Sequence, residues 1–168
     1  TCVNLGCVPK KVMWYVAKMI GDIDKYAEGY GVEFKEEPTL NYPKLKENRD
    51  NYIKFLHTAY QRGLDSNNVE VIKGYAKFVD KNTVDVDGVE YTADHILIAT
   101  GGRPKRLDIP GAEYGIDSDG FFELEKLPES VAVIGGGYIG VEISGLLRTL
   151  GVDAHVFEFL SSVLYTFD

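Results

Sequence analysis

The sequence predicts an α/β fold, and three patterns carry that prediction. Apolar residues recur at a helical period over residues 4–27 and again over residues 43–66. Residues 83–87 alternate between polar and apolar side chains, as a half-buried strand does. From residue 130 onward, an apolar strand, a glycine turn, a helix and a second apolar strand follow one another, which is typical of a nucleotide-binding strand–helix–strand unit.

Two helices are expected before any strand. The first, over residues 4–27, places on its apolar face Val8, Val12, Tyr15, Val16, Met19, Ile20 and Ile23. Residues 28–42 are rich in glycine, proline and glutamate, and this composition predicts an exposed connection. The second helix, over residues 43–66, ends at two asparagines, and its apolar face carries Leu45, Tyr52, Ile53, Leu56 and Tyr60.

A strand-rich stretch follows over residues 69–102. The alternation of residues 83–87 and the Asp87-Gly88 turn predict an antiparallel meander. The apolar run HILIATGG, residues 95–102, is expected to form a strand buried on both faces. Residues 103–120 are rich in proline, glycine and aspartate and predict a linker, so a domain boundary is expected near residues 101–103.

Composition narrows the class of protein. Eighteen basic and 26 acidic residues give a net charge of −8, which argues against nucleic acid as the main partner. No apolar run approaches the roughly 18–20 residues that a membrane-spanning helix needs. The chain starts inside a motif and without methionine, so a fragment without a signal peptide is expected. Two cysteines suggest a reducing compartment such as the cytoplasm and a redox or metal role.

Both cysteines lie in the opening segment, TCVNLGCVPKK. Five residues of ideal helix separate two Cα atoms by about 7.5 Å, whereas a disulfide prefers roughly 4.4–6.8 Å. A bond between Cys2 and Cys7 therefore requires a distorted first turn, which Gly6 and Pro9 favour through flexibility and a missing N–H. A bond held in this way is easier to reduce than a structural one.

The surroundings of Cys7 favour a reactive thiolate. The residue lies near a helix start, and Lys10 and Lys11 follow one turn later. The alternative is two unpaired cysteines packed in a helix. No metal site is expected, because the three histidines are scattered along the chain, at His57, His95 and His155.

The second motif is Gly135-x-Gly137-x-x-Gly140, between a strand and a helix, with Glu158 at the end of the next strand. In this context the motif indicates a dinucleotide site: Gly135 makes the tight turn, Gly137 admits the pyrophosphate, and Gly140 allows close packing. The helix N-terminus favours the phosphates. Glu158 would accept hydrogen bonds from the ribose hydroxyls and repel a 2′-phosphate, which favours NADH over NADPH. The alternative is a glycine turn that only permits packing.

Four segments together carry a family resemblance: TCVNLGCVPKKVMW, HILIATGGRP, GIDSDGFF and GGGYIGVE. They resemble the flavin-dependent pyridine nucleotide-disulfide oxidoreductases, and within them the glutathione reductases. The resemblance implies bound FAD, a homodimer and two Rossmann-like dinucleotide-binding domains, both incomplete here. Residues 1–101 would be the later part of the FAD domain, and residues 102–168 would begin the NAD(P) domain, with its nucleotide unit over residues 130–159.

The resemblance also implies roles for the thiols and their neighbours. Cys7 would be the thiol next to the flavin, and Cys2 the interchange thiol that attacks the substrate disulfide. Lys10 would lie near the flavin and pair with Glu142 of the nucleotide helix. Taken alone, a lysine here predicts only a solvated helix face, and an acid there only complements the helix dipole.

Further contacts follow from the same resemblance. Residues implied to contact the cofactors are Thr1, Thr100 and Gly101 for FAD, and Tyr138, a gate over the flavin face, with Ile139 for the nicotinamide nucleotide. Tyr52 and Tyr60 fall where the family contacts glutathione, although an ordinary helix aromatic is the equal alternative.

Two departures from the family pattern affect these expectations. Members that use NADPH have arginines where this chain has Phe159 and Tyr165, and often alanine in place of Gly140. Both changes favour NADH, as in the reductases of glutathione amide, so the thiol substrate is expected to be glutathione or a modified form. The first glycine motif for FAD, and the dimer domain that supplies a histidine–glutamate pair from the partner, are not in this sequence.

The expected function is therefore an FAD-dependent reductase that passes electrons from NADH through the two cysteines to glutathione disulfide. A lipoamide or mercuric type of reductase is an alternative within the same class. A non-catalytic module that senses dinucleotides is the alternative from another class, although such a module would not need a reactive cysteine pair beside two lysines.

Overall fold

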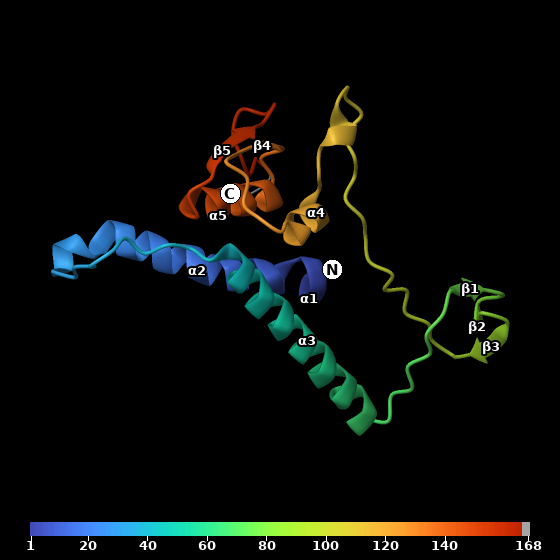
Figure 1. Cartoon of the computed structure of the whole chain (residues 1–168). Helices are drawn as coiled ribbons and strands as arrows, with labels where there is room; N and C mark the ends of the chain where they lie inside the picture. The colour runs from blue at the N-terminus through green and yellow to red at the C-terminus, as the bar shows by residue number, and fades with distance from the viewer. Residues whose placement is uncertain (166–168) are drawn as a thin grey trace. The chain divides into compact units, whose positions relative to one another are not determined.

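The computed structural model describes residues 1–165, which divide into two compact units. The first unit joins residues 1–54 to the chain from Pro104 onward, and the second is Phe55–Arg103. Figure 1 shows the helices and strands of each unit. The structure confirms the α/β fold, with an antiparallel meander and a parallel strand–helix–strand unit. The expected division into an FAD domain and an NAD(P) domain remains a prediction.

The first helical stretch is interrupted at Gly6. Helix α1 is Cys2–Leu5, and helix α2 is Cys7–Tyr26. The N–H of Leu5 donates to the carbonyl of Thr1 at 2.8 Å, and the N–H of Lys10 donates to the carbonyl of Gly6 at 3.1 Å. Because Pro9 has no N–H to donate to the carbonyl of Leu5, the helix cannot run unbroken through this point. The stretch expected to be one helix over residues 4–27 is therefore two helices with a break at Gly6.

The predicted apolar face of α2 is confirmed only in part, because Val12 and Val16 are half-buried and pack against the core. The buried residues of α2 are Pro9, Met13 and Ala17, whereas Tyr15 and Met19 are exposed. Helix α5, Tyr138–Thr149, packs on this side of α2. The two helices approach closely at Gly21, where a Cβ would lie 3.2 Å from Thr149 Cγ2. The predicted face left out Pro9, Met13 and Ala17, although these are the most buried residues of the helix.

The nucleotide unit forms as the sequence predicted. Strands β4, Ser130–Ile134, and β5, Asp153–Phe157, are parallel, with Ser130 opposite Asp153. Helix α5 connects the two strands and buries Leu146 and Leu147. The core of this unit also contains Val152, which immediately precedes β5.

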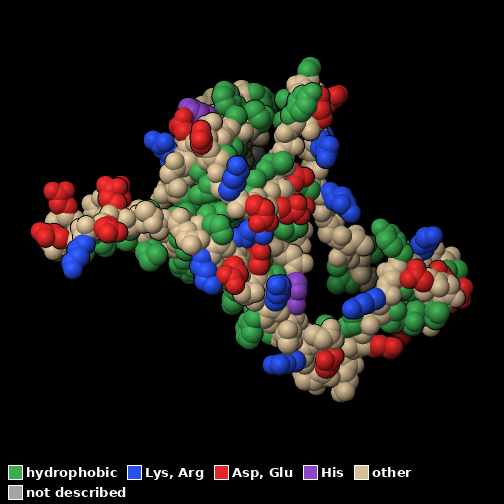
Figure 2. Space-filling view, in the orientation of Figure 1, with side chains coloured by type: hydrophobic (Ala, Val, Ile, Leu, Met, Phe, Trp, Pro, Cys, Tyr) green, Lys and Arg blue, Asp and Glu red, His purple; other side chains and the backbone are tan. Residues whose placement is uncertain are grey.

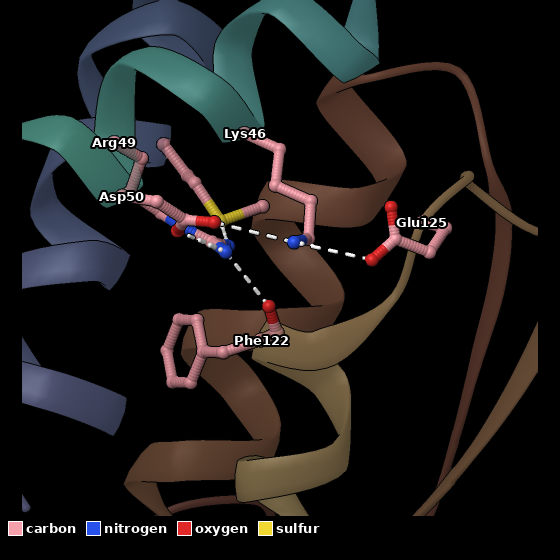
Figure 3. Close-up of polar contacts among 6 residues, drawn as sticks. Lys46, Arg49, Asp50, Phe122 and Glu125 are labelled. Atoms are coloured by element: carbon pink, nitrogen blue, oxygen red, sulfur yellow. Dashed lines mark hydrogen bonds and ion pairs between the residues drawn. The ribbon is translucent and has the colours of Figure 1, made fainter.

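Helices α3, Tyr42–Ser66, and α4, Ser118–Glu123, meet α2 at a buried arginine. Arg49 is 3 % exposed and donates to Asp50 Oδ1 and to the carbonyl of Phe122, at 2.7 and 2.8 Å from Nη2 (Figure 3). Its Nη1 lies 3.5 Å from Met13 Sδ on α2. Burial opposes ionisation of Asp50, but the hydrogen bonds from Arg49 and Lys46 outweigh it, so the pKa of this carboxyl group lies below its ordinary value.

Helix α4 begins at the end of the stretch expected to be a linker, residues 103–120, and continues beyond it to Glu123. Asp117 caps it by accepting hydrogen bonds from the N–H groups of Asp119 and Gly120, both at 3.1 Å. Phe121 and Phe122 are buried. The signal for this helix was present as an aspartate cap followed by two aromatic residues. Two short 3₁₀ turns lie within the stretches predicted to be connections, at Glu28–Tyr30 and Ala112–Tyr114.

The predicted apolar face of α3 is wrong for its two tyrosines, whereas Leu45 is buried and Ile53 and Leu56 are half-buried. Tyr52 and Tyr60 are 46 % and 57 % exposed, and the buried residues are Tyr42, Leu45 and Arg49. The contacts of Arg49 with α2 and α4 lie in the first turns of the helix, and these turns are the ones that become buried.

The exposed connection over residues 28–42 is mostly confirmed, although Tyr42 itself is buried as the first residue of α3. Figure 2 shows acidic side chains gathered at the end of α2 and on the segment that follows it. The exposed acidic residues here are Glu28, Glu33, Glu36 and Glu37. This segment therefore contributes strongly to the negative charge of the surface.

The second unit contains the predicted meander. Strands β1, Ala76–Phe78, β2, Thr83–Val86, and β3, Val89–Thr92, pair antiparallel in that order. Asp87 and Gly88 both have positive φ, of 51° and 93°, as a two-residue hairpin turn requires.

The buried strand expected at residues 95–102 is absent. Leu97 and Ile98 are 90 % and 67 % exposed, and no described strand pairs with this segment. An apolar run has no stability as a strand unless a neighbour satisfies its backbone groups. The prediction was therefore wrong for the residues that the structure describes.

We expect Arg49→Ala to lower the free energy of unfolding of the intact protein by about 3–5 kcal/mol, because it leaves Asp50 and the carbonyl of Phe122 short of a partner. Urea unfolding measures this loss. The control is Lys44→Ala, which removes an exposed ion pair with Glu47 and should cost about 0–1 kcal/mol. Equal losses in the two variants would contradict a stabilising role for the buried arginine.

Candidate functional site

The two cysteines lie together at the start of the first unit. Both are exposed free thiols, so the predicted disulfide is not formed in this structure. The Cys2 thiol is instead hydrogen bonded to the side chain of Cys7. This hydrogen bond raises the pKa of Cys2, and partial desolvation and the negative charge of Cys7 raise it further, whereas the backbone N–H of Cys7 acts in the opposite direction. The two sulfurs are therefore hydrogen bonded and not joined by a disulfide in this structure.

Gly6 is the reason that Cys2 folds back over the start of α2. A Cβ at this position would lie 3.1 Å from both Cys2 Cα and the carbonyl oxygen of Thr1. So close a contact would force the backbone at Thr1 and Cys2 to move by a few tenths of an ångström, and hence a side chain at this position between α1 and α2 is unfavourable. The approach of the two thiols therefore depends on this glycine.

An ion pair joins the thiol helix to the nucleotide helix. Lys10 Nζ lies 2.9 Å from Glu142 Oε2, and the two side chains are 26 % and 44 % exposed. The expected pairing is present, although its chemical role remains a prediction. Lys10 follows Cys7 by three residues, so the thiol and the ammonium group lie on neighbouring positions of one helix face.

The second lysine of the motif has a different environment. Lys11 Nζ lies 3.7 Å from the centre of the Trp14 ring and 5.0 Å from that of Tyr15. Such cation–π contacts stabilise a surface lysine without chemistry. The two adjacent lysines therefore have different contacts, an ion pair for Lys10 and aromatic rings for Lys11.

The glycine loop between β4 and α5 has the shape that a dinucleotide needs. Gly135 has φ of +110°, which only glycine adopts readily. A Cβ on Gly140 would overlap the carbonyl oxygen of Gly135, so the helix and the loop touch. A Cβ on Gly137 would meet no described atom within 4 Å. The loop is therefore open at Gly137, beside the N-terminus of α5, where phosphates bind favourably.

Glu158 directly follows β5 and folds back onto this loop. Its Oε2 accepts from the N–H of Gly136 at 2.6 Å, and its Oε1 accepts from the N–H groups of Phe159 and Leu160 at 2.8 and 3.0 Å. The hydrogen bonds from Leu160, Gly136 and Phe159 lower the pKa of the carboxyl group. A carboxylate held at this point is placed as the acid that accepts hydrogen bonds from the adenosine ribose hydroxyls of a nicotinamide dinucleotide.

The first residues of α5 are accessible. Tyr138 and Ile139 are 62 % and 45 % exposed. A groove of about 660 Å³ runs between α2 and α5, and its lining includes Trp14, Tyr138 and Glu142. The aromatic ring expected to be a gate thus lies on an open face, beside the partner of Lys10.

The other residues predicted to contact a cofactor or the substrate do not all belong to the unit that contains this site. Thr1 lies at the start of α1, and Tyr52 is an exposed residue of α3, both in the first unit. Tyr60, Thr100 and Gly101 belong to the second unit. Their assignments to glutathione and FAD remain predictions.

Sequence reasoning missed Gly136 and Arg49. Gly136 is the variable position of its motif, and nothing in the sequence shows that a carboxylate will bind its N–H. Arg49 lies in a charged helical segment that reads as a solvated surface. Only the contacts of these residues in the folded chain show that each is constrained.

Comparisons with known proteins agree with this geometry. Residues 1–168 match the family described as Pyridine nucleotide-disulphide oxidoreductase. The chain belongs to this family, as its motifs predicted.

One relative is glutathione reductase of Schizosaccharomyces pombe, 44 % identical over 175 residues, in an alignment that covers 100 % of this chain and 38 % of that protein. A similar solved structure is the HOCl-induced flavoprotein disulfide reductase RclA from Escherichia coli, with a TM-score of 0.80 and 27 % identity. That comparison covers 98 % of this chain and 34 % of RclA. The chain thus spans well under half of these proteins.

Within residues 1–165, no helix is both long and apolar enough to cross a membrane. In the same described part of the chain, no group of three or more histidine, cysteine, aspartate or glutamate side chains is placed to hold a metal ion.

We expect Gly6→Ala to move Cys2 away from Cys7 and to make their disulfide harder to form. The equilibrium constant against glutathione should fall about tenfold, which corresponds to roughly 30 mV. Titration of the intact protein in glutathione redox buffers, with counting of free thiols, measures it. Gly29→Ala is the control, because a Cβ there meets nothing within 4 Å. An unchanged potential in Gly6→Ala would show that this glycine does not control the thiol pair.

Glu158 also predicts a pH dependence. Because folding lowers its pKa, the carboxylate stabilises the fold above its unfolded pKa of about 4.3, and this contribution is lost as the pH falls through the folded value. Unfolding midpoints of the intact protein and of Glu158→Gln should differ by a constant amount from pH 7 to 5 and converge below that range. A constant difference down to pH 3 would contradict the proposed backbone hydrogen bonds of the carboxylate.

Proposed function

We propose that this chain is part of an FAD-dependent reductase that transfers electrons from NADH to glutathione disulfide or a modified glutathione. The observation that carries the proposal is the ion pair between Lys10 and Glu142, which joins the helix that begins at Cys7 to the helix that follows the dinucleotide loop. Electron transfer from a nicotinamide to a disulfide needs these two elements close together. Family membership and similarity to a glutathione reductase support the same conclusion.

The residues present fit the cofactors that such a reaction needs. The open loop at Gly137 and the carboxylate of Glu158 suit a dinucleotide without a 2′-phosphate. Cys7 and Lys10 offer a thiol and an ammonium group side by side on the exposed start of α2. FAD, when bound, supplies the step between the hydride of the nicotinamide and the two electrons that reduce a disulfide.

The thiols perform the exchange. The Cys2 thiolate attacks one sulfur of the substrate disulfide, which breaks the bond and releases one glutathione thiolate to take up a proton. Cys7 then attacks the Cys2 sulfur of the mixed disulfide, a second glutathione leaves, and the bond between Cys2 and Cys7 forms. Two electrons and two protons restore the dithiol. The raised pKa of Cys2 means that it must lose its proton to a base before it attacks.

Three further parts of the proposal rest on the resemblance. Tyr138 gates the face where the nicotinamide binds, and its exposure on the groove beside Glu142 supports this role. Tyr52 and Tyr60 contact the glutathione substrate. The intact protein is a homodimer of the cytoplasm whose partner subunit supplies the acid–base histidine.

The preference for NADH rests on this chain's own residues. A carboxylate held by backbone N–H groups at Glu158 repels a 2′-phosphate. Phe159 and Tyr165, which are exposed, stand where the family's NADPH enzymes have arginines, and neither can pair with a phosphate charge.

The proposal is tested in the intact flavoprotein with Cys2→Ser. We expect the variant to lose glutathione disulfide reduction by at least about 1,000-fold, because serine cannot form the mixed disulfide. Stopped-flow reduction of the flavin by NADH should continue at a rate similar to that of the wild type, because this half of the reaction does not use Cys2. Wild-type turnover of glutathione disulfide in Cys2→Ser would disprove the assignment of the interchange thiol.

A further inference from the structure

Gly136, the middle glycine of the loop, is enclosed by the segment that follows β5. Its N–H donates to Glu158 at 2.6 Å, and its carbonyl accepts from the N–H of Leu164 at 2.8 Å. A Cβ on Gly136 would lie 2.8 Å from Glu158 Oε2 and 2.9 Å from Val163 Cγ1. No side chain fits at this position while the carboxylate stays where it is.

The hydrogen bonds of Glu158 leave limited room for a ligand. A carboxylate has about four acceptor sites, two on each oxygen. Oε1 accepts two N–H groups and Oε2 accepts one, from Gly136. The site that remains is on Oε2, the oxygen that Gly136 holds, and this oxygen can accept one hydroxyl of a ribose without losing its bond to the loop.

We propose that Gly136 determines the choice between NADH and NADPH by positioning Glu158. Because Gly136 has no side chain, Oε2 of Glu158 can accept a hydrogen bond from the loop and another from a ribose hydroxyl. This inference rests on the proposed use of NADH and extends it to a residue outside the ribose contact itself. With alanine at position 136, the Cβ would displace the carboxylate. Glu158 would then neither bind the ribose well nor stand close enough to repel a 2′-phosphate.

Binding of the oxidised nucleotides to the intact protein tests this inference, because NAD⁺ and NADP⁺ do not react with the oxidised flavin. Isothermal titration calorimetry should show Gly136→Ala raising the Kd of NAD⁺ about tenfold, the scale of one charge-assisted hydrogen bond. The Kd of NADP⁺ should stay the same or fall, so that the ratio of the two constants changes by at least that factor. Gly145→Ala, on α5, is the matched control, because a Cβ there meets nothing within 4 Å.

Two further variants separate positioning from simple crowding. Gly136→Ala combined with Val163→Ala removes the second contact of the new methyl group, and the ratio should still change. In a Glu158→Ala background, Gly136→Ala should alter the Kd of NAD⁺ less than twofold, because there is no carboxylate to displace. A tenfold effect in that background would overturn the inference.

The remaining outcomes distinguish this inference from the proposed function. A wild-type protein that binds NADP⁺ as tightly as NAD⁺ would overturn the proposed cofactor and this inference together. A wild-type preference for NAD⁺ that is kept in Gly136→Ala/Val163→Ala would overturn the role of Gly136 alone.

Discussion

The packing of α2 against α5 is the contact on which the rest of the first unit depends. Pro9, Met13 and Ala17 are the buried residues of α2, and the absence of a side chain at Gly21 lets α2 and α5 approach. The N-terminal end of α2 carries Cys7, with Cys2 beside it on α1, and the N-terminal end of α5 carries the glycine loop. Their contact therefore brings the two chemical elements together, and the exposed ion pair of Lys10 with Glu142 marks where they meet. Apolar burial supplies most of the stability of such a contact, and an exposed ion pair contributes little to it.

Backbone N–H groups organise both halves of the candidate site. At the thiol end, the N–H of Cys7 reaches the Cys2 sulfur, beside the hydrogen bond between the two thiols. At the nucleotide end, three N–H groups hold the carboxylate of Glu158 over the loop. Both arrangements need a glycine nearby, Gly6 or Gly136, because a Cβ would fill the space through which the partner approaches.

Much of the fold and site was predictable from local patterns. Periodicity located α3 and α5, the Asp87-Gly88 turn located the hairpin, and the glycine spacing located the nucleotide loop with Glu158. The failures share a physical cause, which is that burial depends on neighbours. Tyr52 is exposed and Arg49 is buried on the same helix, and the apolar run around Leu97 forms no strand without a described partner.

By itself, the sequence determined the kinds of chemistry available: a cysteine pair in a strained turn, a dinucleotide loop and an acid at the ribose end. These are local properties, because they depend on residue types at short spacings. Only the tertiary structure decided that Lys10 reaches Glu142, 132 residues further along the chain, and that Gly136 is enclosed by Glu158 and Val163. Such contacts depend on how helices and strands pack, and packing is set by the whole surrounding surface.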